Sequence, residues 1–212
     1  MRLREAKIVA ERLLALMSPF CVRIEVAGSV RRSCAEVKDV ELVAVPRWEE
    51  RPGAAPSLFA EEAERVNLLH EWAVNEAAGA SVRWIKTGTP DVVDWAPKPE
   101  GKYWRALVGD SIKLDLFLAA PENYGMIMAI RTGCAEFSQG LMTYAKHRTP
   151  YHVEGGYLRD RDGKELETPE ERDVFRALKL DYVLPRERTG QHMVRRAGRP
   201  QFPRKATQGT RS

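Results

Sequence analysis

Cysteine is scarce in this chain of 212 residues: there are three, Cys21, Cys34 and Cys134. An odd number of cysteines with no close pair does not fit a disulfide framework or the paired ligands of a structural zinc site. No apolar run approaches the roughly 18 residues of a membrane-spanning helix, and the first residues do not form a signal peptide. We therefore expect a protein of the reducing cytoplasm that has no membrane partner.

Acidic residues are absent from one part of the chain. Residues 191–212 contain six lysines and arginines and no aspartate or glutamate, whereas the formal net charge of the whole chain is +4. The other 190 residues therefore carry −2, the difference between +4 and +6. Composition thus gives no basis for a basic groove across the folded body. The polar, proline- and glycine-containing segment 191–212 is predicted to be a disordered basic tail.

Hydrophobic residues make up 43% of the chain, and their periodicity predicts both helices and strands. Apolar residues recur at helical spacing over residues 2–17, and they alternate with polar residues over 22–26. Residues 38–45 and 112–118 are predicted as two further, more apolar strands. Residues 58–78 carry apolar side chains at helical spacing, which predicts one long amphipathic helix.

The pattern changes after residue 120. Residues 122–131 and 135–147 are predicted as helices. Two strand segments, residues 151–158 and a short one around Glu165, flank a predicted hairpin turn at 160–163. Thr168 is followed by a proline and two glutamates, which is the sequence of a helix N-cap, so a helix is predicted to begin there.

Three carboxylates fall on two of the predicted strands. Asp39 and Glu41 are two residues apart and therefore share a face of one strand, while Asp115 lies in the middle of the other. Carboxylates on the same face of adjacent strands repel each other unless cations lie between them, and such oxygen ligands suit Mg²⁺ or Mn²⁺. Two ions held in this way clamp the attacking and leaving oxygens of a phosphoryl transfer. We predict Asp39, Glu41 and Asp115 as catalytic residues and as ligands of two Mg²⁺ ions, which Mn²⁺ could replace.

A candidate phosphate-binding turn precedes these carboxylates. Gly28 lies between a predicted strand and a helix, where a glycine lets the backbone approach a ligand and a helix N-terminus offers free N–H groups. Ser29 adds a hydroxyl group, and Arg32 adds a planar cation that can bind two phosphate oxygens. We therefore predict that Gly28, Ser29 and Arg32 bind the phosphates of a nucleoside triphosphate.

These segments resemble a known family. Gly28-Ser29-Val30-Arg31-Arg32, followed by Asp39-Val40-Glu41, resembles the nucleotidyltransferase signature of family X DNA polymerases, the DNA polymerase beta-like family. Ile112-Lys113-Leu114-Asp115-Leu116 resembles the strand with the family's third metal carboxylate. Arg131-Thr132-Gly133 resembles the family's turn beside the nucleotide sugar and base, which implies that these three residues bind the substrate. The resemblance covers roughly residues 5–190.

The resemblance implies an α+β fold in two subdomains and a tail. Residues 1–120 would form a nucleotidyltransferase palm, a mixed sheet with helices that begins with an N-terminal helix. Residues 121–190 would form a small α+β nucleotide-binding subdomain of the thumb type. Residues 191–212 would be the basic tail.

Three features depart from the family pattern. Glu41 stands where family X polymerases usually have aspartate, and Ile130-Arg131 replaces an aromatic pair before Thr132. Only 27 residues precede Gly28, so we expect a minimal form without the family's N-terminal lyase domain or its helix-hairpin-helix modules.

The family implies a DNA-directed DNA polymerase that adds nucleotides from a nucleoside triphosphate to a DNA 3′-hydroxyl, as in gap filling during DNA repair. Its partners would be a primer-template or gapped DNA duplex and the triphosphate, and the protein would be a monomer. One alternative is a template-independent nucleotidyltransferase that acts on RNA ends, a protein or a small molecule. The other is a non-catalytic nucleic-acid-binding module. Sequence alone does not separate templated from untemplated addition, or deoxyribonucleotides from ribonucleotides.

Overall fold

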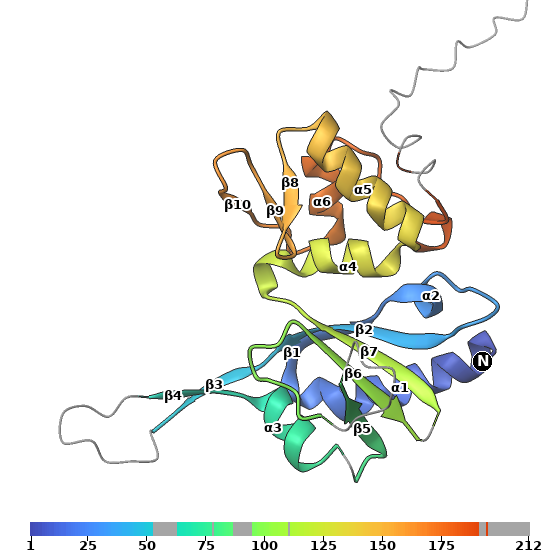
Figure 1. The fold of residues 1–212 in the computed structure, drawn as a ribbon, viewed down its shortest axis with the longest axis vertical. Helices are drawn as coiled ribbons and strands as arrows, with labels where there is room; N and C mark the ends of the chain where they lie inside the picture. The colour runs from blue at the N-terminus through green and yellow to red at the C-terminus, as the bar shows by residue number, and fades with distance from the viewer. Residues whose placement is uncertain (53–62, 78, 87–94, 110, 191–193, 195–212) are drawn as a thin grey trace, which may run out of the picture.

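The computed structural model describes residues 1–52, 63–77, 79–86, 95–109, 111–190 and 194, and it has an α+β fold (Figure 1). Its main sheet has the strand order β1-β2-β7-β6-β5, in which β2 and β7 are parallel and the other pairs are antiparallel. The strands are β1 (Cys21–Val26), β2 (Asp39–Pro46), β5 (Val82–Ile85), β6 (Tyr103–Val108) and β7 (Ile112–Leu118). The expectation of a mixed sheet with helices is confirmed.

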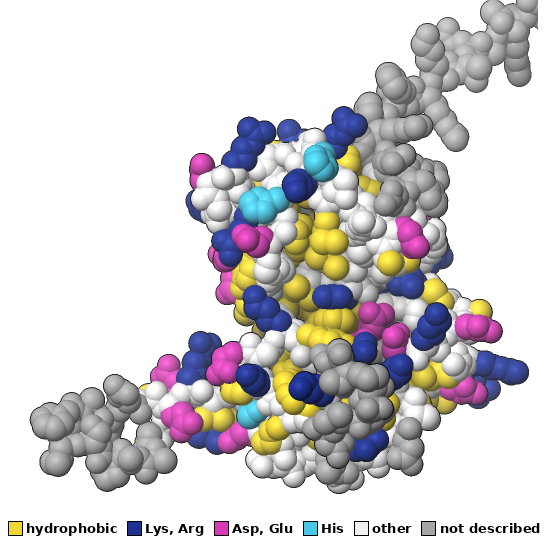
Figure 2. All heavy atoms as spheres, in the orientation of Figure 1, with side chains coloured by type: hydrophobic (Ala, Val, Ile, Leu, Met, Phe, Trp, Pro, Cys, Tyr) yellow, Lys and Arg dark blue, Asp and Glu magenta, His cyan; other side chains and the backbone are white. Residues whose placement is uncertain are grey.

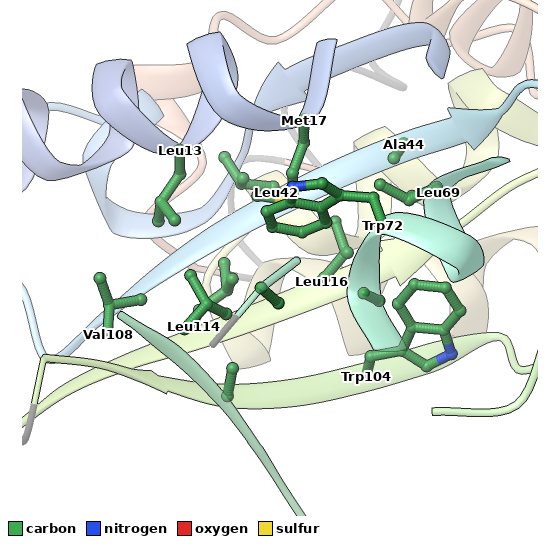
Figure 3. Close-up of a cluster of buried hydrophobic side chains, with 14 of the residues drawn as sticks. Leu13, Met17, Leu42, Ala44, Leu69, Trp72, Trp104, Val108, Leu114 and Leu116 are labelled. Atoms are coloured by element: carbon green, nitrogen blue, oxygen red, sulfur yellow. The ribbon is translucent and has the colours of Figure 1, made fainter. Parts of the chain in front are cut away.

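One face of the sheet is covered by α1 (Leu3–Met17) and α3 (Leu68–Asn75). Leu42 of β2 and Leu116 of β7 point into this layer, because alternate residues of a strand face the same side (Figure 3). Trp72 and Trp104 are also buried there, at 4% and 0% exposure. These apolar contacts fix which face of β2 and β7 is left for their polar residues.

The opposite face packs against α4 (Tyr124–Thr132), which follows the 3₁₀ turn η2 (Pro121–Asn123). Val43 and Phe117 of the sheet and Tyr124 and Met128 of α4 form one buried cluster. The short helix α2 (Gly28–Arg31) lies over the same face, next to β2 and α4. The predicted carboxylates belong to this face, because their neighbours in sequence point into the α1 and α3 layer.

The C-terminal part of the chain has its own core, on the far side of α4 (Figure 1). Its other elements are α5 (Ala135–Arg148), β8 (His152–Glu154), β9 (Tyr157–Arg159), β10 (Glu165–Leu166), α6 (Glu171–Ala177) and the 3₁₀ turn η3 (Pro185–Glu187). The expected boundary between residues 120 and 121 falls between β7 and η2. Val194 is 2% exposed within this core, so the predicted disordered tail is wrong at that residue, and the rest of 191–212 lies outside the described residues.

The helix predicted over residues 58–78 is wrong in its first described part. Residues 64–67 form the strand β4 (Glu64–Asn67), which pairs with β3 (Trp48–Arg51) in a two-stranded arm that projects from the sheet (Figure 1). Asn67 ends the strand and caps α3, because its side-chain oxygen accepts a hydrogen bond from the His70 N–H at 3.1 Å. An N-cap inside the apolar pattern therefore divides it into a strand and a shorter helix. Residues 58–62 and 78 lie outside the described part of the chain.

Two predictions for the C-terminal part also need correction. Thr168 is not an N-cap: it is fully buried, and its backbone pairs with Glu122 and Gly125. The cap lies two residues later, where the Glu170 N–H donates to the Asp173 carboxylate at 3.0 Å. Residues 151–158 are not one strand, because a turn at Gly155-Gly156 with positive φ at both residues separates β8 from β9.

No helix among the described residues is long and apolar enough to cross a membrane. The three cysteines are free thiols, and Cys21 is buried.

Candidate active site

The three predicted carboxylates lie on one face of the sheet. The parallel register of β2 and β7 sets Glu41 opposite Asp115, and Asp39 opposite Lys113. The acidic side chains therefore occupy neighbouring positions on the face that also carries α2 and α4. Figure 2 shows acidic side chains gathered between the two halves of the molecule, flanked by lysines and arginines.

Burial and mutual repulsion raise the pKa values of two carboxylates on this face, Glu41 and Asp39. The pKa of Glu41 is raised to about 7 by burial and by the charges of Asp39 and Asp115, against the opposing charges of Arg32 and Arg131. The pKa of Asp39 is also raised, by burial and by Asp115. The carboxylates are thus close enough to repel each other, which is the electrostatic setting that a divalent cation relieves.

Asp115 is bound by two side chains of β6. Arg105 donates to both of its carboxylate oxygens, from Nε to Oδ1 at 2.7 Å and from Nη2 to Oδ2 at 2.9 Å. The Tyr103 hydroxyl donates to Oδ1 at 2.8 Å. Asp115 is only 6% exposed, so these bonds replace most of its contact with water. Both oxygens of the Asp115 carboxylate are thus held by side chains of β6.

The acidic face fits Mg²⁺ or Mn²⁺ in its chemistry. Three carboxylates on neighbouring strands supply the hard oxygen donors that these ions prefer. Within the described residues, however, no three acidic, histidine or cysteine side chains are placed so that they could hold a metal ion. In this arrangement the Asp115 carboxylate is engaged by Arg105. The donor set is therefore chemically suitable for these ions.

The glycine turn next to this face has no room for a larger residue. Gly28 has φ of +61°, and a Cβ atom added to it would lie 1.6 Å from Glu41 Oε2. Only glycine therefore lets the turn approach the Glu41 carboxylate this closely. The Ser29 hydroxyl is buried and has no hydrogen-bond partner among the described residues. An unpaired buried hydroxyl in a turn of this kind is available to a polar ligand.

The structure brings the two predicted substrate-binding turns together. Arg32 donates from Nη1 to the Thr132 carbonyl at 2.7 Å, and Arg31 donates from Nη1 to the Thr132 hydroxyl at 2.8 Å. Thr132 is fully buried at the end of α4, and Gly133 is the C-cap of that helix. A Cβ on Gly133 would lie 2.5 Å from the Phe137 ring, so this turn also requires a glycine.

Arg131 lies at the edge of both the acidic face and a groove. Its guanidinium group is 4.0 Å from the centre of the Phe117 ring, and its charge lowers the pKa of Glu41 in opposition to burial. The groove has a volume of about 1060 Å³, and its lining includes Ile130, Arg131, Tyr103 and Phe117. The side chains that replace the family's aromatic pair therefore line a space large enough for a nucleotide.

A buried charge network supports these turns, and the sequence analysis did not identify it. Glu171 of α6 accepts hydrogen bonds from Arg31 Nη2 at 2.7 Å, from the Tyr182 hydroxyl at 3.1 Å and from Arg188. Arg188 is fully buried. Burial acts to raise the pKa of Glu171, but the Arg31 hydrogen bond and the Arg188 charge outweigh it, so the pKa is lowered. The one sequence signal is that Glu171 shares the helical spacing of buried Val174 and Leu178.

Arg105 and Tyr103 were likewise missed. Their signal is the short turn between β6 and β7, because a tight hairpin fixes which residues face each other. This register places Arg105 opposite Asp115, and Tyr103 opposite Phe117.

Comparisons with known proteins match parts of the chain. Residues 128–189 match the family described as DNA polymerase beta thumb. Over 90 residues the chain is 31% identical to a DNA nucleotidylexotransferase of Bos taurus and 32% identical to one of Xenopus laevis. Each of these matches covers 42% of this chain but only 17% of the relative. The similarity thus concerns about a sixth of the length of either relative.

Proposed function

The chain is a family X polymerase-like protein, and from this premise we propose that it is a nucleotidyltransferase that acts on DNA. It would transfer a nucleoside 5′-monophosphate from a triphosphate to a DNA 3′-hydroxyl and release pyrophosphate, as in filling a gap in a duplex. The observation that carries the proposal is the convergence of Asp39, Glu41 and Asp115 with the Gly28 turn and the Thr132 turn.

Each part of the site has a role in this reaction. Asp39, Glu41 and Asp115 would hold the Mg²⁺ ions, which supply positive charge to the attacking and leaving oxygens. Ser29 would donate its unpaired hydroxyl to the triphosphate, and Arg32 would exchange the Thr132 carbonyl for phosphate oxygens. Arg131, Thr132 and Gly133 would border the sugar and base beside the groove.

Proton transfer would involve the same carboxylates. The attacking 3′-hydroxyl has to lose a proton, and Asp115 would help to accept it at a carboxylate oxygen.

The name of the two relatives, DNA nucleotidylexotransferase, favours a second candidate, template-independent addition to a DNA end. Transfer to RNA, a protein or a small molecule is a weaker alternative, because residues 128–189 match a DNA polymerase domain. A non-catalytic module is weaker still, because it gives no reason for three carboxylates and an unpaired hydroxyl on one face.

A primer-extension assay tests the proposal. Purified protein with Mg²⁺ is given a gapped duplex or a single strand, with each nucleoside triphosphate supplied separately. We expect extension of the gapped duplex only with the complementary nucleotide, and loss of at least 1000-fold in rate for Asp115→Asn. Equal use of all four nucleotides on the single strand would establish the second candidate. No incorporation with any DNA, or full activity of Asp115→Asn, would refute the proposal.

A further inference from the structure

Arg105, Asp115 and Glu41 form a row across three neighbouring strands. Glu41 and Asp115 are register partners in β2 and β7, and Asp115 and Arg105 are register partners in β7 and β6. Asp115 therefore lies between an acid on one side and a cation on the other. Its carboxylate is bonded on the side of the cation.

The hydrogen bonds on this face are unevenly distributed. Asp115 Oδ1 accepts two, from Tyr103 and Arg105, and Oδ2 accepts one from Arg105. In the described part of the chain no group donates to the side-chain oxygens of Asp39 or Glu41. The three carboxylates therefore differ: hydrogen-bond donors hold both oxygens of Asp115, whereas those of Asp39 and Glu41 have no such donors among the described residues.

We propose that Arg105 is a positioning residue that holds Asp115 toward β6, so that a divalent cation must take Asp115 from Arg105 in order to bind. Tyr103 assists by fixing Oδ1. The inference rests on the proposed function, since it concerns the same metal-binding carboxylates. It adds a competition between a protein cation and the metal ion, which sets how much Mg²⁺ the protein requires.

Two properties make Arg105 suited to this role. Its planar guanidinium binds both oxygens of Asp115 at once, which fixes the direction of the carboxylate as well as neutralising it. Its side chain is 33% exposed, whereas that of Asp115 is 9% exposed, so the arginine can withdraw into solvent while Asp115 stays in place. A supporting role, in which Arg105 remains bound and orients Asp115 for the metal, makes the opposite prediction for metal affinity.

The test is a titration with Mn²⁺ alone, in which free Mn²⁺ is followed by electron paramagnetic resonance. We expect Arg105→Gln to bind Mn²⁺ at least tenfold more tightly than wild type. Lys113→Gln is the matched control, because Lys113 is exposed, lies on the same face opposite Asp39, and makes no hydrogen bond to Asp115. It removes the same charge and should tighten binding less than threefold. Tyr103→Phe should fall between the two.

Arg105→Lys provides a second variant that keeps the positive charge. Lysine cannot form the two parallel bonds of a guanidinium, so an intermediate gain in Mn²⁺ affinity is expected. Weaker Mn²⁺ binding by Arg105→Gln, or a gain equal to that of Lys113→Gln, would overturn the inference. If Arg105→Gln does not fold, unchanged affinity in both Arg105→Lys and Tyr103→Phe overturns it.

The same titration separates this inference from the proposed function. Wild-type protein should bind Mn²⁺, and the Asp39→Asn substitution should abolish this binding. If it does so and the Arg105 variants bind no more tightly, the inference fails and the proposed function stands. If wild-type protein binds no Mn²⁺, or Asp39→Asn leaves binding unchanged, the proposed function fails and the inference fails with it.

Discussion

Glu41 couples the stability of the protein to pH. Its pKa rises from 4.5 to about 7 in the fold, so the folded protein binds a proton that the unfolded chain releases. The stabilisation from this proton is complete below about pH 4.5 and is lost as the pH rises through 7. The whole loss is on the order of 3.5 kcal/mol, because each tenfold change in proton affinity is worth about 1.4 kcal/mol, and about 2–3 kcal/mol of it falls between pH 5 and pH 8.

We therefore predict that, with EDTA present, the free energy of unfolding falls by this amount between pH 5 and pH 8. Glu41→Gln should flatten the dependence, since its amide needs no proton. Chemical denaturation at several pH values measures it. Glu167→Gln is the control, because Glu167 is exposed and far from the acidic face in sequence. A Glu41→Gln profile as steep as that of wild type would contradict the prediction.

At the scale of elements, α2, α4 and α6 are tied together by buried charges. Arg31 of α2 bonds both Thr132 of α4 and Glu171 of α6, and Arg188, the residue after η3, also bonds Glu171. Removing one partner of such a network leaves the other charges buried and uncompensated, which costs about 3–5 kcal/mol. These contacts join the Gly28 turn to the C-terminal core.

We predict that Glu171→Gln lowers the free energy of unfolding by about 3 kcal/mol at pH 7. Arg176→Gln is the matched control on the same helix: it breaks an ion pair with Asp173 in which the arginine is 77% exposed, and should cost under about 0.5 kcal/mol.

The lowered pKa of Glu171 gives a stabilisation that is present above pH 4.5 and is lost on acidification. Urea denaturation of both variants at pH 7 and pH 4 measures these effects. Equal costs for the two substitutions would show that Glu171 is not held as described.

The helices and strands that could be predicted from the sequence are those that their own local apolar pattern determines. The strands β2 and β7 were predicted because each is a short, mostly apolar run. Asp39 and Glu41 were placed on one face because side chains two apart on a strand share a face. The helix predicted over 58–78 is confirmed at 68–75 and wrong at 64–67, because Asn67 caps α3 and ends the preceding strand. The role of Glu171 depends on how distant elements pack, and spacing along the chain does not reveal that. The role of Arg105 follows only when the register of the β6–β7 hairpin is known.

At the scale of the whole molecule, charge is unevenly distributed along the chain. Residues 1–190 carry −2 and residues 191–212 carry +6, with all six cations after Val194. A DNA duplex is strongly anionic, so if the proposed function holds, these cations would supply sequence-independent contacts to phosphate. Each phosphate neutralised contributes about −0.9 to the slope of log K against log salt.

Replacement of those six cations by glutamine keeps Val194 in the C-terminal core. We predict that the substituted protein binds a DNA duplex with a salt slope shallower by roughly 2–5. Single-nucleotide addition at saturating DNA should be unchanged, because the acidic face is not altered. Fluorescence anisotropy between about 50 and 200 mM salt measures the slope. An unaltered slope would leave these residues without a part in DNA binding.

Helix α4 belongs to two cores at once, and this restricts how the molecule can move. Met126 and Ala129 are buried in the C-terminal core, while Tyr124 and Met128 are buried against the sheet. Because both sides of the helix are packed, the two halves are not joined by a free hinge. A rotation of one half over the other has to slide side chains of α4 across Val43 and Phe117. Motion of this kind is shear, so we expect any displacement of the two halves to proceed by small sliding of packed side chains rather than by a wide swing.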